Sequence, residues 1–294
     1  MSDYVLSCES TADLPEETME EFSLSYIPFH FYLDDVEYPD DLGKTVPYDE
    51  FYQRMEDGAE TRTATISLGE YRQYFRSFLE EGKDVLHVSL SSGLSAACEA
   101  ARSAAESLAE EFPERTICVV DSLGASSGYG LLMVTLAEKR DEGATIDELR
   151  DWTVANRLRV HHEFFSTDLT FYVKGGRVKP VTGYVGNLLN ICPLLDVDAR
   201  GKLVPREKVR SKSKVIKRIV DKMESCADDG LGYKGRVFIS ESACMEDARA
   251  VAELVEERFA EMKEKVRISS IGTTIGSHTG PGTVALFFWG TQRA

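Results

Sequence analysis

Small hydroxyl side chains and a glycine are concentrated in the stretch "SLSSGLSAA" (89–97). The apolar run before it, "DVLHVSL" (84–90), is typical of a strand, and the alanine-rich run after it is typical of a helix. The first N–H groups of a helix are unpaired and attract anions, and hydroxyl groups add further donors. The stretch therefore favours either a carboxylate or phosphate site or a plain capped helix start. Its small polar residues are Ser91, Ser92, Gly93 and Ser95.

Two more hydroxyl-rich stretches occur at similar points of the chain. "TRTATIS" (61–67) precedes a helix expected over 68–81, and "DSLGASSG" (121–128) follows a strand expected over 116–121. Each stretch by itself is typical of a helix N-cap loop. Three such loops at the carboxyl edge of one parallel sheet, where ligands usually bind, indicate that together they hold one anionic group.

A histidine among glycines forms a fourth candidate. His278 lies in "GSHTGPG" (276–282), which we expect to be a loop before the last strand. Glycines allow unusual backbone angles and close approach of a ligand. A loop histidine that is merely exposed is the alternative. The other four histidines, at 30, 87, 161 and 162, are expected to be ordinary sheet residues.

Most catalytic signatures are missing from the sequence. There is no G-x-S-x-G elbow, no G-x-x-x-x-G-K-[ST] phosphate loop and no G-x-G-x-x-G. The six cysteines show no C-x-x-C spacing, and no His/Cys/Asp cluster has metal-ligand spacing. We therefore expect free thiols in a reducing compartment, no metal and no cofactor.

The overall charge limits the partners. The net charge is −16 and the isoelectric point about 4.8, which argues against a general nucleic-acid binder and against docking on an anionic membrane. The sequence shows no signal peptide and no apolar run of about 18 residues, so a cytoplasmic protein is expected.

Basic residues nevertheless gather in one segment. Ten lysines and arginines occur between Arg200 and Lys222, and "KGGRV" (174–178) adds two more. They indicate either a solvated helix face or a basic patch for a phosphorylated ligand or an acidic partner.

The pattern of elements predicts an α/β protein. Strands and amphipathic helices alternate up to about residue 157, which is typical of a parallel sheet covered by helices. Short strands then dominate, with a hairpin turn at "DARGKL" (198–203). We expect an N-terminal parallel α/β domain over 1–157, a two-layer α/β domain with a mixed sheet over 158–294, and the ligand between them.

Seven short blocks in order carry a resemblance to a known family. They are "ESTADLP" (9–15), "TRTATIS", "SSGLSAA" (91–97), "VVDS" (119–122), "KGGRV", "VRSKSK" (209–214) and "HTGPG" (278–282). From about residue 4 to 289, this series resembles the DegV family. The resemblance implies a protein that binds a long-chain fatty acid and serves as the non-catalytic acyl-carrying subunit of bacterial fatty acid kinase. A separate ATP-dependent kinase subunit phosphorylates the carboxylate for phospholipid synthesis.

The resemblance also assigns roles to residues. Thr63 and Ser95 match the hydroxyl residues that hold the carboxylate, and His278 matches a histidine beside it. Ser92 and Gly93 belong to the same serine-rich loop and complete the expected ligand-binding set.

A second set is assigned to the phosphoryl group or to docking of the kinase. It consists of Arg210, which matches an arginine of the basic block, with Lys174 and Arg177.

The sequence departs from the family pattern at several positions. Ala64, Ile66, Ala96 and Ala97 replace the usual neighbours of the hydroxyl residues, Lys174 stands where arginine is common, and Glu9 replaces an aspartate. These departures leave the acyl-chain preference open.

Affinity is expected to come mainly from the tail. Burying ~15 methylene groups at ~0.8 kcal/mol each contributes roughly 12 kcal/mol before the cost of association. The aromatic stretches over 26–33 and 163–173 are candidates for lining the tail, although plain core is the more usual role of such segments.

Two functions of other classes remain as alternatives. One is a serine-dependent lipid hydrolase or acyltransferase with Ser95 as nucleophile and His278 as base. The other is a DNA-binding regulator that uses the basic segment over 200–222. The missing elbow argues against the first alternative, and the acidic chain argues against the second.

Overall fold

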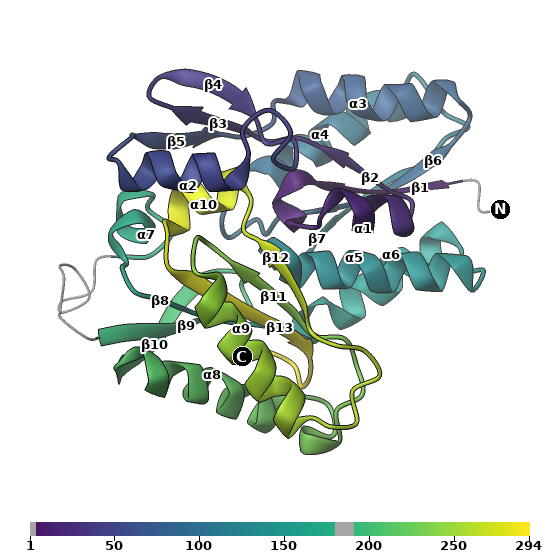
Figure 1. Cartoon of the computed structure of the whole chain (residues 1–294). Helices are drawn as coiled ribbons and strands as arrows, with labels where there is room; N and C mark the ends of the chain where they lie inside the picture. The colour runs from purple at the N-terminus through teal and green to yellow at the C-terminus, as the bar shows by residue number, and fades with distance from the viewer. Residues whose placement is uncertain (1–3, 180–190) are drawn as a thin grey trace.

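The computed structural model describes residues 4–179 and 191–294, which form two large sheets and one small sheet (Figure 1). The first large sheet is parallel throughout, with the order β2–β1–β6–β7. This arrangement confirms the predicted parallel α/β architecture of the N-terminal part. The strands are β1 (Tyr4–Glu9), β2 (Leu24–Ile27), β6 (Asp84–Ser89) and β7 (Ile117–Asp121).

Helices cover both faces of the parallel sheet (Figure 1). α3 and α4 pack on one face, whereas α1, α5 and α6 pack on the other. α3 and α6 both begin with a capping box, in which the Ser67 and Thr145 hydroxyls accept the backbone N–H of the third helical residue. α3 begins at Leu68, as predicted. The helices are α1 (Glu16–Glu21), α3 (Leu68–Glu80), α4 (Ala97–Ala109), α5 (Ser126–Asp141) and α6 (Ile146–Asn156).

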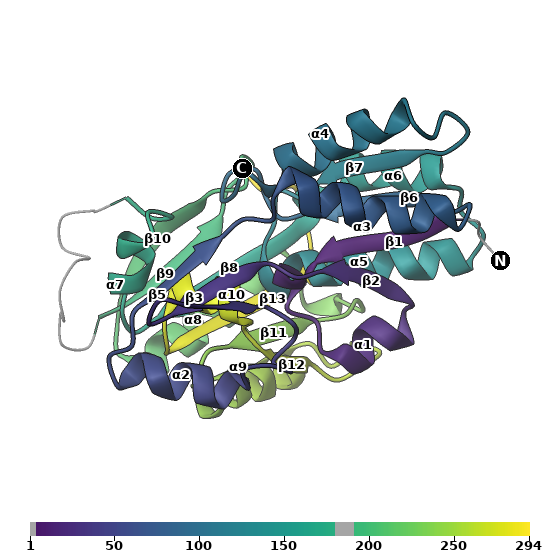
Figure 2. The ribbon, with the colours of Figure 1, turned by 90° about the horizontal axis from the view of Figure 1, so that it is seen from above.

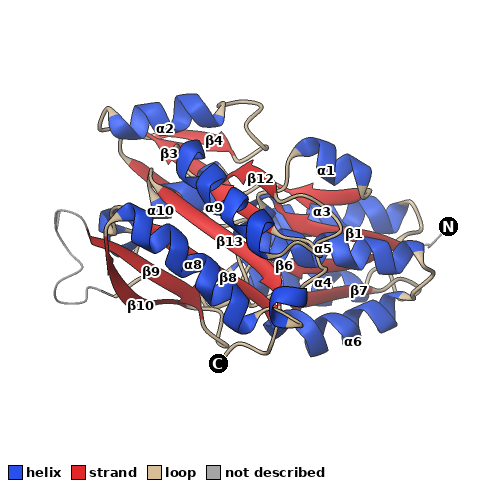
Figure 3. Ribbon diagram, turned by 60° about the horizontal axis from the view of Figure 1, so that its bottom comes forward, coloured by secondary structure: helices blue, strands red, loops and turns tan. Residues whose placement is uncertain are grey.

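The second large sheet is mixed, as predicted. Its order is β10–β9–β8–β13–β11–β12, and β11 with β12 is its parallel pair. Figure 3 shows α8 and α9 side by side on one face. The strands are β8 (Val160–Ser166), β9 (Ile191–Val197), β10 (Leu203–Arg210), β11 (Phe238–Glu241), β12 (Arg267–Ser270) and β13 (Thr283–Trp289), and the helices are α8 (Lys212–Cys226) and α9 (Met245–Arg258).

Helix α5 joins the two large sheets. Phe164 and Phe287 of the mixed sheet belong to the same buried cluster as the apolar residues of α5. Two glycines of α5 allow this close packing. A Cβ at Gly130 would lie 2.7 Å from the carbonyl oxygen of Ala12, and a Cβ at Gly128 would overlap the imidazole of His162.

The stretch over 23–33, whose aromatic and apolar content predicts one strand, forms two strands in different sheets. β2 ends at Ile27, and β3 begins at His30 after the interruption at Pro28. Phe29 donates its N–H to the Ser10 hydroxyl at 3.1 Å instead of to a neighbouring strand. Apolar and β-branched content does not show such a break, because it favours a strand on either side of the proline.

The second part of that stretch belongs to a small antiparallel sheet, ordered β4–β3–β5, with α2 beside it. This sheet comes from the N-terminal half of the chain but packs against α10 of the C-terminal half (Figure 2). Contacts of this kind cross the domain boundary expected near residue 158, and that boundary stays a prediction. The elements are β3 (His30–Leu33), β4 (Val36–Pro39), β5 (Thr61–Ala64) and α2 (Tyr48–Glu56).

The predicted loop around His278 is mostly helix. α10 (Thr273–Thr279) begins after Gly272 and ends at Gly280, whose φ of 68° favours glycine. Gly280 of "GSHTGPG" therefore ends a helix and Gly276 lies inside it, so these glycines do not open a ligand loop. Short elements complete the described chain: α7 (Thr170–Lys174) and the 3₁₀ turns η1 (Ser10–Ala12), η2 (Arg157–Arg159) and η3 (Gly230–Gly232). In the described part of the chain, no helix combines the length and the apolar character that a membrane span requires.

Candidate functional site

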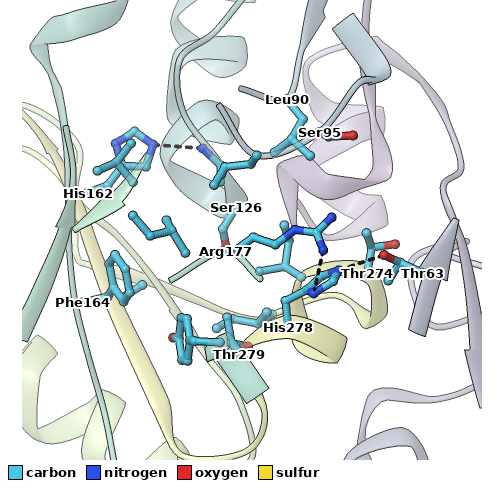
Figure 4. Close-up of a pocket in the computed structure, with 18 of the residues that line it drawn as sticks. Thr63, Leu90, Ser95, Ser126, His162, Phe164, Arg177, Thr274, His278 and Thr279 are labelled. Carbon is cyan, nitrogen blue, oxygen red and sulfur yellow. Dashed lines mark hydrogen bonds between the residues drawn. The ribbon is translucent and has the colours of Figure 1, made fainter. Parts of the chain in front are cut away.

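A cavity of about 570 Å³ lies where the parallel sheet, the small sheet, α10 and the mixed sheet meet. Most of its wall is apolar. The β6–α4 loop, the β5 strand and α10 contribute polar residues to one part of the wall (Figure 4). Its larger apolar side chains are Phe29, Leu90, Leu94, Phe164, Leu203, Ile275 and Phe287.

Three side chains from distant segments form a polar chain on this wall. The Thr63 hydroxyl lies 2.8 Å from Nε2 of His278, and Nδ1 of His278 lies 3.4 Å from Nη1 of Arg177 (Figure 4). Since a guanidinium only donates, Nδ1 must accept, and Nε2 then bears the proton that it donates to Thr63. The hydroxyl proton of Thr63 is thereby left to point at a ligand.

His278 is neutral at physiological pH. Burial, reinforced by the positive charge of Arg177, lowers its pKa to about 4. Burial also lowers the pKa of Arg177. A Cβ at Gly175 would overlap Nδ1 of His278. The imidazole can therefore occupy this position only because residue 175 has no side chain.

The serine-rich loop provides another part of the polar wall. Ser95 lines the cavity, and its Oγ accepts the N–H of Ala97 at 3.2 Å, so its own proton remains available for a ligand. Ser92 also lines the cavity but is exposed, and its N–H binds Asp121 at 3.2 Å.

Gly93 lies outside the cavity lining and has a packing role. A Cβ there would lie 2.7 Å from the carbonyl oxygens of both Arg200 and Gly201, which form the turn between β9 and β10. The Ser91 hydroxyl donates to the Gly201 carbonyl at 2.8 Å. Gly93 therefore allows this loop to pack on the β9–β10 hairpin. The prediction that Gly93 binds the ligand is not supported by its position, because it packs on the protein instead. The predicted hairpin turn itself is confirmed.

The Glu9 side chain holds the start of the serine-rich loop in place. Its fully buried carboxylate accepts the N–H of Leu90 at 2.9 Å and the hydroxyl of Ser89 at 2.6 Å. Burial alone would raise the pKa of Glu9. Hydrogen bonds and the adjacent His87 outweigh this effect and lower it. The carboxylate thus fixes the end of β6, from which the loop to Ser95 starts.

Asp13 connects the two halves beside the cavity. Its carboxylate accepts the Ser126 hydroxyl of α5 at 2.5 Å and the N–H of Gly272, at the start of α10, at 3.0 Å. Burial, together with the charge of Asp40, raises the pKa of Asp13 well above its usual range. α5 and α10 are therefore tied to the same group.

A smaller pocket of about 290 Å³ lies on the other side of the polar chain. It shares Thr63, Arg177 and His278 with the cavity, and Arg62 and Lys174 also line it. Lys174 is exposed and lies 3.5 Å from Glu60. Arg177 thus contacts the candidate head-group site directly, whereas Lys174 lies in the outer pocket.

Arg210 is exposed at the end of β10, outside the lining of both pockets. Several other cations of the basic segment are paired with acidic side chains. Arg218 and Lys222 both bind Glu207, and Lys212 binds Asp247. These pairs reduce the positive field that a DNA-binding patch would need.

The sequence did not identify most of the cavity wall. The aromatic stretches named as possible linings contribute Phe29, Phe164 and Tyr172. His162, expected to be an ordinary sheet residue, also lines the cavity. Its Nε2 accepts the N–H of Ala125 at 3.2 Å, and burial lowers its pKa far below the usual value. Neither the residues next to His162 nor its spacing from other polar residues indicated that it lines the cavity.

The geometry does not favour a serine nucleophile. Nε2 of His278 faces Thr63, and no hydrogen bond joins Ser95 to His278 within the described ranges. Nor do those ranges contain a group of three or more acidic, cysteine or histidine side chains suited to a metal ion. The polar wall is instead a set of donors around an apolar cavity, which suits the carboxylate of an amphipathic ligand.

Known proteins are similar to this chain in both sequence and fold. A DegV domain-containing protein of Clostridium perfringens is 30% identical over 293 residues, which cover 100% of this chain and 99% of the relative. A protein of Thermotoga maritima named as a fatty acid-binding protein is 31% identical, with 94% of each chain covered. The crystal structure of a DegV lipid-binding protein from the same organism superimposes with a TM-score of 0.86 at 27% identity and covers 100% of both chains.

The family model described as "Uncharacterised protein, DegV family" matches residues 6–290. Apart from the first two residues of β1, the match covers both large sheets, and it includes every residue of the polar wall. The chain therefore belongs to the DegV family.

Proposed function

We propose that this protein binds one long-chain fatty acid in the cavity and presents its carboxylate to a separate ATP-dependent kinase subunit, which converts it to an acyl phosphate. The observation that carries the proposal is an apolar cavity with the hydroxyl donors Thr63 and Ser95 on its wall, and with Arg177 3.4 Å from His278, which in turn contacts Thr63. The name of the Thermotoga maritima relative supports the fatty acid as ligand.

The head group is held by neutral donors with a cation behind them. The protons of Thr63 and Ser95 are free to donate to a carboxylate, and His278 orients Thr63. Arg177 contributes charge through His278, which stays neutral because its pKa is about 4. A hydrogen bond to a charged group contributes about 1.5–3 kcal/mol, so the tail still dominates the affinity.

The outer pocket supports the presentation of the carboxylate to a partner. It lies on the far side of Thr63, His278 and Arg177 and is also lined by Arg62 and Lys174. Arg62 and Lys174 lie 3.6 Å from Asp35 and 3.5 Å from Glu60, respectively, so we assign the positive charge that an approaching phosphoryl group would meet chiefly to Arg177. We assign Arg177 and Lys174 to that phosphoryl group and Arg210 to docking of the kinase. The protein itself then acts in the bacterial cytoplasm as a non-catalytic carrier and binds neither nucleic acid nor membrane.

Native mass spectrometry of freshly purified protein tests the ligand. A co-purified mass of a C14–C18 acid is expected, and protein without any bound lipid that also fails to take up added palmitate would refute the proposal.

Substitutions test the placement of the head group. Thr63→Val and Ser95→Ala should each weaken palmitate binding by about 1–3 kcal/mol without unfolding the protein. Ser77→Ala, on the exposed face of α3, is the matched control. Equal affinities in all three variants would contradict the assignment.

A further inference from the structure

The helix that carries His278 has no capping side chain of its own. α10 begins after Gly272, and two buried carboxylates from the N-terminal part of the chain accept the backbone N–H groups at its start instead. Asp13 accepts the N–H of Gly272 at 3.0 Å, and Asp40 accepts the N–H of Thr274 at 3.3 Å. The start of α10 is therefore held by side chains that are 259 and 234 residues away in sequence.

Asp13 contacts more elements around the cavity than this one helix. It belongs to the block "ESTADLP" (9–15), none of whose residues lines the cavity. Its carboxylate also accepts the hydroxyl of Ser126, the first residue of α5, at 2.5 Å. Its backbone carbonyl accepts the hydroxyls of Ser127 and Ser269 at 3.0 and 3.2 Å. Asp13 therefore joins α5, β12 and α10 at one point.

The packing at this point is close. A Cβ at Gly272 would lie 2.6 Å from Oδ1 of Asp13 and 3.5 Å from Oδ1 of Asp40. Asp13 itself has a φ of 47°, in the left-handed region that aspartate and asparagine adopt more readily than most residues. Position 13 thus requires both this backbone conformation and a side chain that pairs with Gly272 and Ser126.

α10 connects its start to the candidate head-group site. Thr274 and His278 both line the cavity, and residues four positions apart lie on the same face of a helix. The His278 imidazole lies 2.8 Å from the Thr63 hydroxyl. A displacement of α10 by ~1 Å would lengthen this contact beyond hydrogen-bond distance. The contact therefore depends on how firmly the start of the helix is held.

We propose that Asp13 is a positioning residue: by holding the start of α10, it fixes the His278 imidazole against Thr63 and so directs the Thr63 hydroxyl toward the carboxylate of the ligand. The inference rests on the proposed function for the ligand, and on the hydrogen bonds alone for the position of His278. Asp13 needs no negative charge for this role, since burial raises its pKa well above the usual range and opposes ionisation.

Two substitutions of Asp13 separate this role from a general effect on stability. In Asp13→Asn, the amide oxygen accepts the Gly272 N–H and the amide nitrogen donates to Ser126, whose hydroxyl then donates to Ser240, 2.9 Å away. Asp13→Gly keeps the backbone conformation and removes both side-chain contacts. Thr153→Ala is the matched control, because it removes a buried side-chain hydrogen bond within α6, outside the cavity lining.

The test measures the position of His278 and the binding of palmitate on the delipidated full-length protein. The NMR titration of His278 is assigned by comparison with His278→Gln. In Asp13→Gly the pKa of His278 should rise from about 4 toward the value of about 6.5 for an exposed histidine, because the ring is no longer held in its buried position. Palmitate should bind roughly 2- to 10-fold more weakly. Asp13→Asn and Thr153→Ala should keep the wild-type titration and affinity.

The inference and the proposed function fail in different ways. An unchanged titration of His278 in Asp13→Gly overturns the role of Asp13, and so does Asp13→Asn that behaves like Asp13→Gly. An equal shift in Thr153→Ala also overturns it, because a loss of stability alone would then move His278. Wild type that does not bind palmitate refutes the proposed function, while the titration still decides the role of Asp13. If thermal melts show that Asp13→Gly does not fold, Asp13→Ser, which leaves one oxygen in place of two, decides instead.

Discussion

A substitution that removes no polar group tests the Thr63–His278–Arg177 chain most directly. Gly175 has a φ of −73°, which alanine adopts without strain, but the added Cβ would overlap Nδ1 of His278. In Gly175→Ala the imidazole must therefore move, although every hydrogen-bonding side chain of the site is still present.

The cost can be worked out from the contacts that the ring makes. Movement of the imidazole breaks its contacts with Arg177 at 3.4 Å and with Thr63 at 2.8 Å, and the Thr63 hydroxyl loses its orientation toward the carboxylate. A neutral hydrogen bond contributes about 1 kcal/mol and one to a charged group up to about 3 kcal/mol. Palmitate should therefore bind roughly 5- to 150-fold more weakly.

The assay is isothermal titration of palmitate into delipidated protein, with Gly69→Ala as control. A Cβ at Gly69 would come no closer than 3.9 Å to another group, the Ser67 hydroxyl, so this variant should bind like wild type.

A double-mutant cycle adds specificity to the test. In a His278→Ala background the ring is already absent, and Gly175→Ala should cost little more, which gives a coupling of about 1 kcal/mol or larger. Wild-type affinity in Gly175→Ala, or strictly additive losses, would refute the reasoning about the polar chain.

Three further predictions concern the kinase step and pH. Arg210→Ala should leave palmitate binding intact and slow acyl-phosphate formation, because an exposed charge at a rim acts on a partner's approach; an equal loss of lipid affinity would place Arg210 in the pocket. The purified chain should make no acyl-hydroxamate from ATP, palmitate and hydroxylamine until the kinase subunit is added, and His278→Ala should reduce that activity more than it reduces lipid binding; robust turnover by the chain alone would reveal a nucleotide site. Since the pKa of His278 is about 4 in the folded protein and about 6.5 unfolded, the unfolded chain binds an extra proton between these values, so stability falls as pH drops through this window. Urea unfolding at pH 7 and pH 5 should show a drop that is about 1–2 kcal/mol smaller in His278→Gln than in wild type, and equal drops would contradict it.

The sequence alone was sufficient for the architecture, and its family resemblance pointed to the side chains that the structure brings to the polar wall: Thr63, Ser95, Arg177 and His278. Alternating strand and helix patterns predicted the parallel sheet, because periodicity reflects which face of each element is buried. Two of the three hydroxyl-rich loops were found for the same reason: the carboxyl ends of parallel strands meet at one edge, so Ser92, Ser95 and Ser126 all line the cavity. The third prediction was wrong in its position, because Thr61–Ala64 forms β5 of the small antiparallel sheet and does not lie at the edge of the parallel sheet.

Other features depend on contacts between residues far apart in the chain. The break at Pro28 places β3 in a separate sheet, and His278 lies in a helix that packs against that sheet. Thr63 and His278 are 215 residues apart in sequence, and their contact exists only because the small sheet packs on α10. No local pattern encodes such a contact.

Residues close together in the sequence show most clearly what tertiary structure adds to the sequence. His161 and His162 are identical in type, yet only His162 lines the cavity, because successive side chains of β8 face opposite sides of the sheet. Gly93 and Ser95 belong to one motif, but one docks on the hairpin and the other lines the cavity. The sequence by itself determined the family, the sheet edge and the chemistry of the donors. The packing of three sheets around α5 and α10 decided which side chains face the cavity, because burial and orientation depend on elements that are distant in the chain.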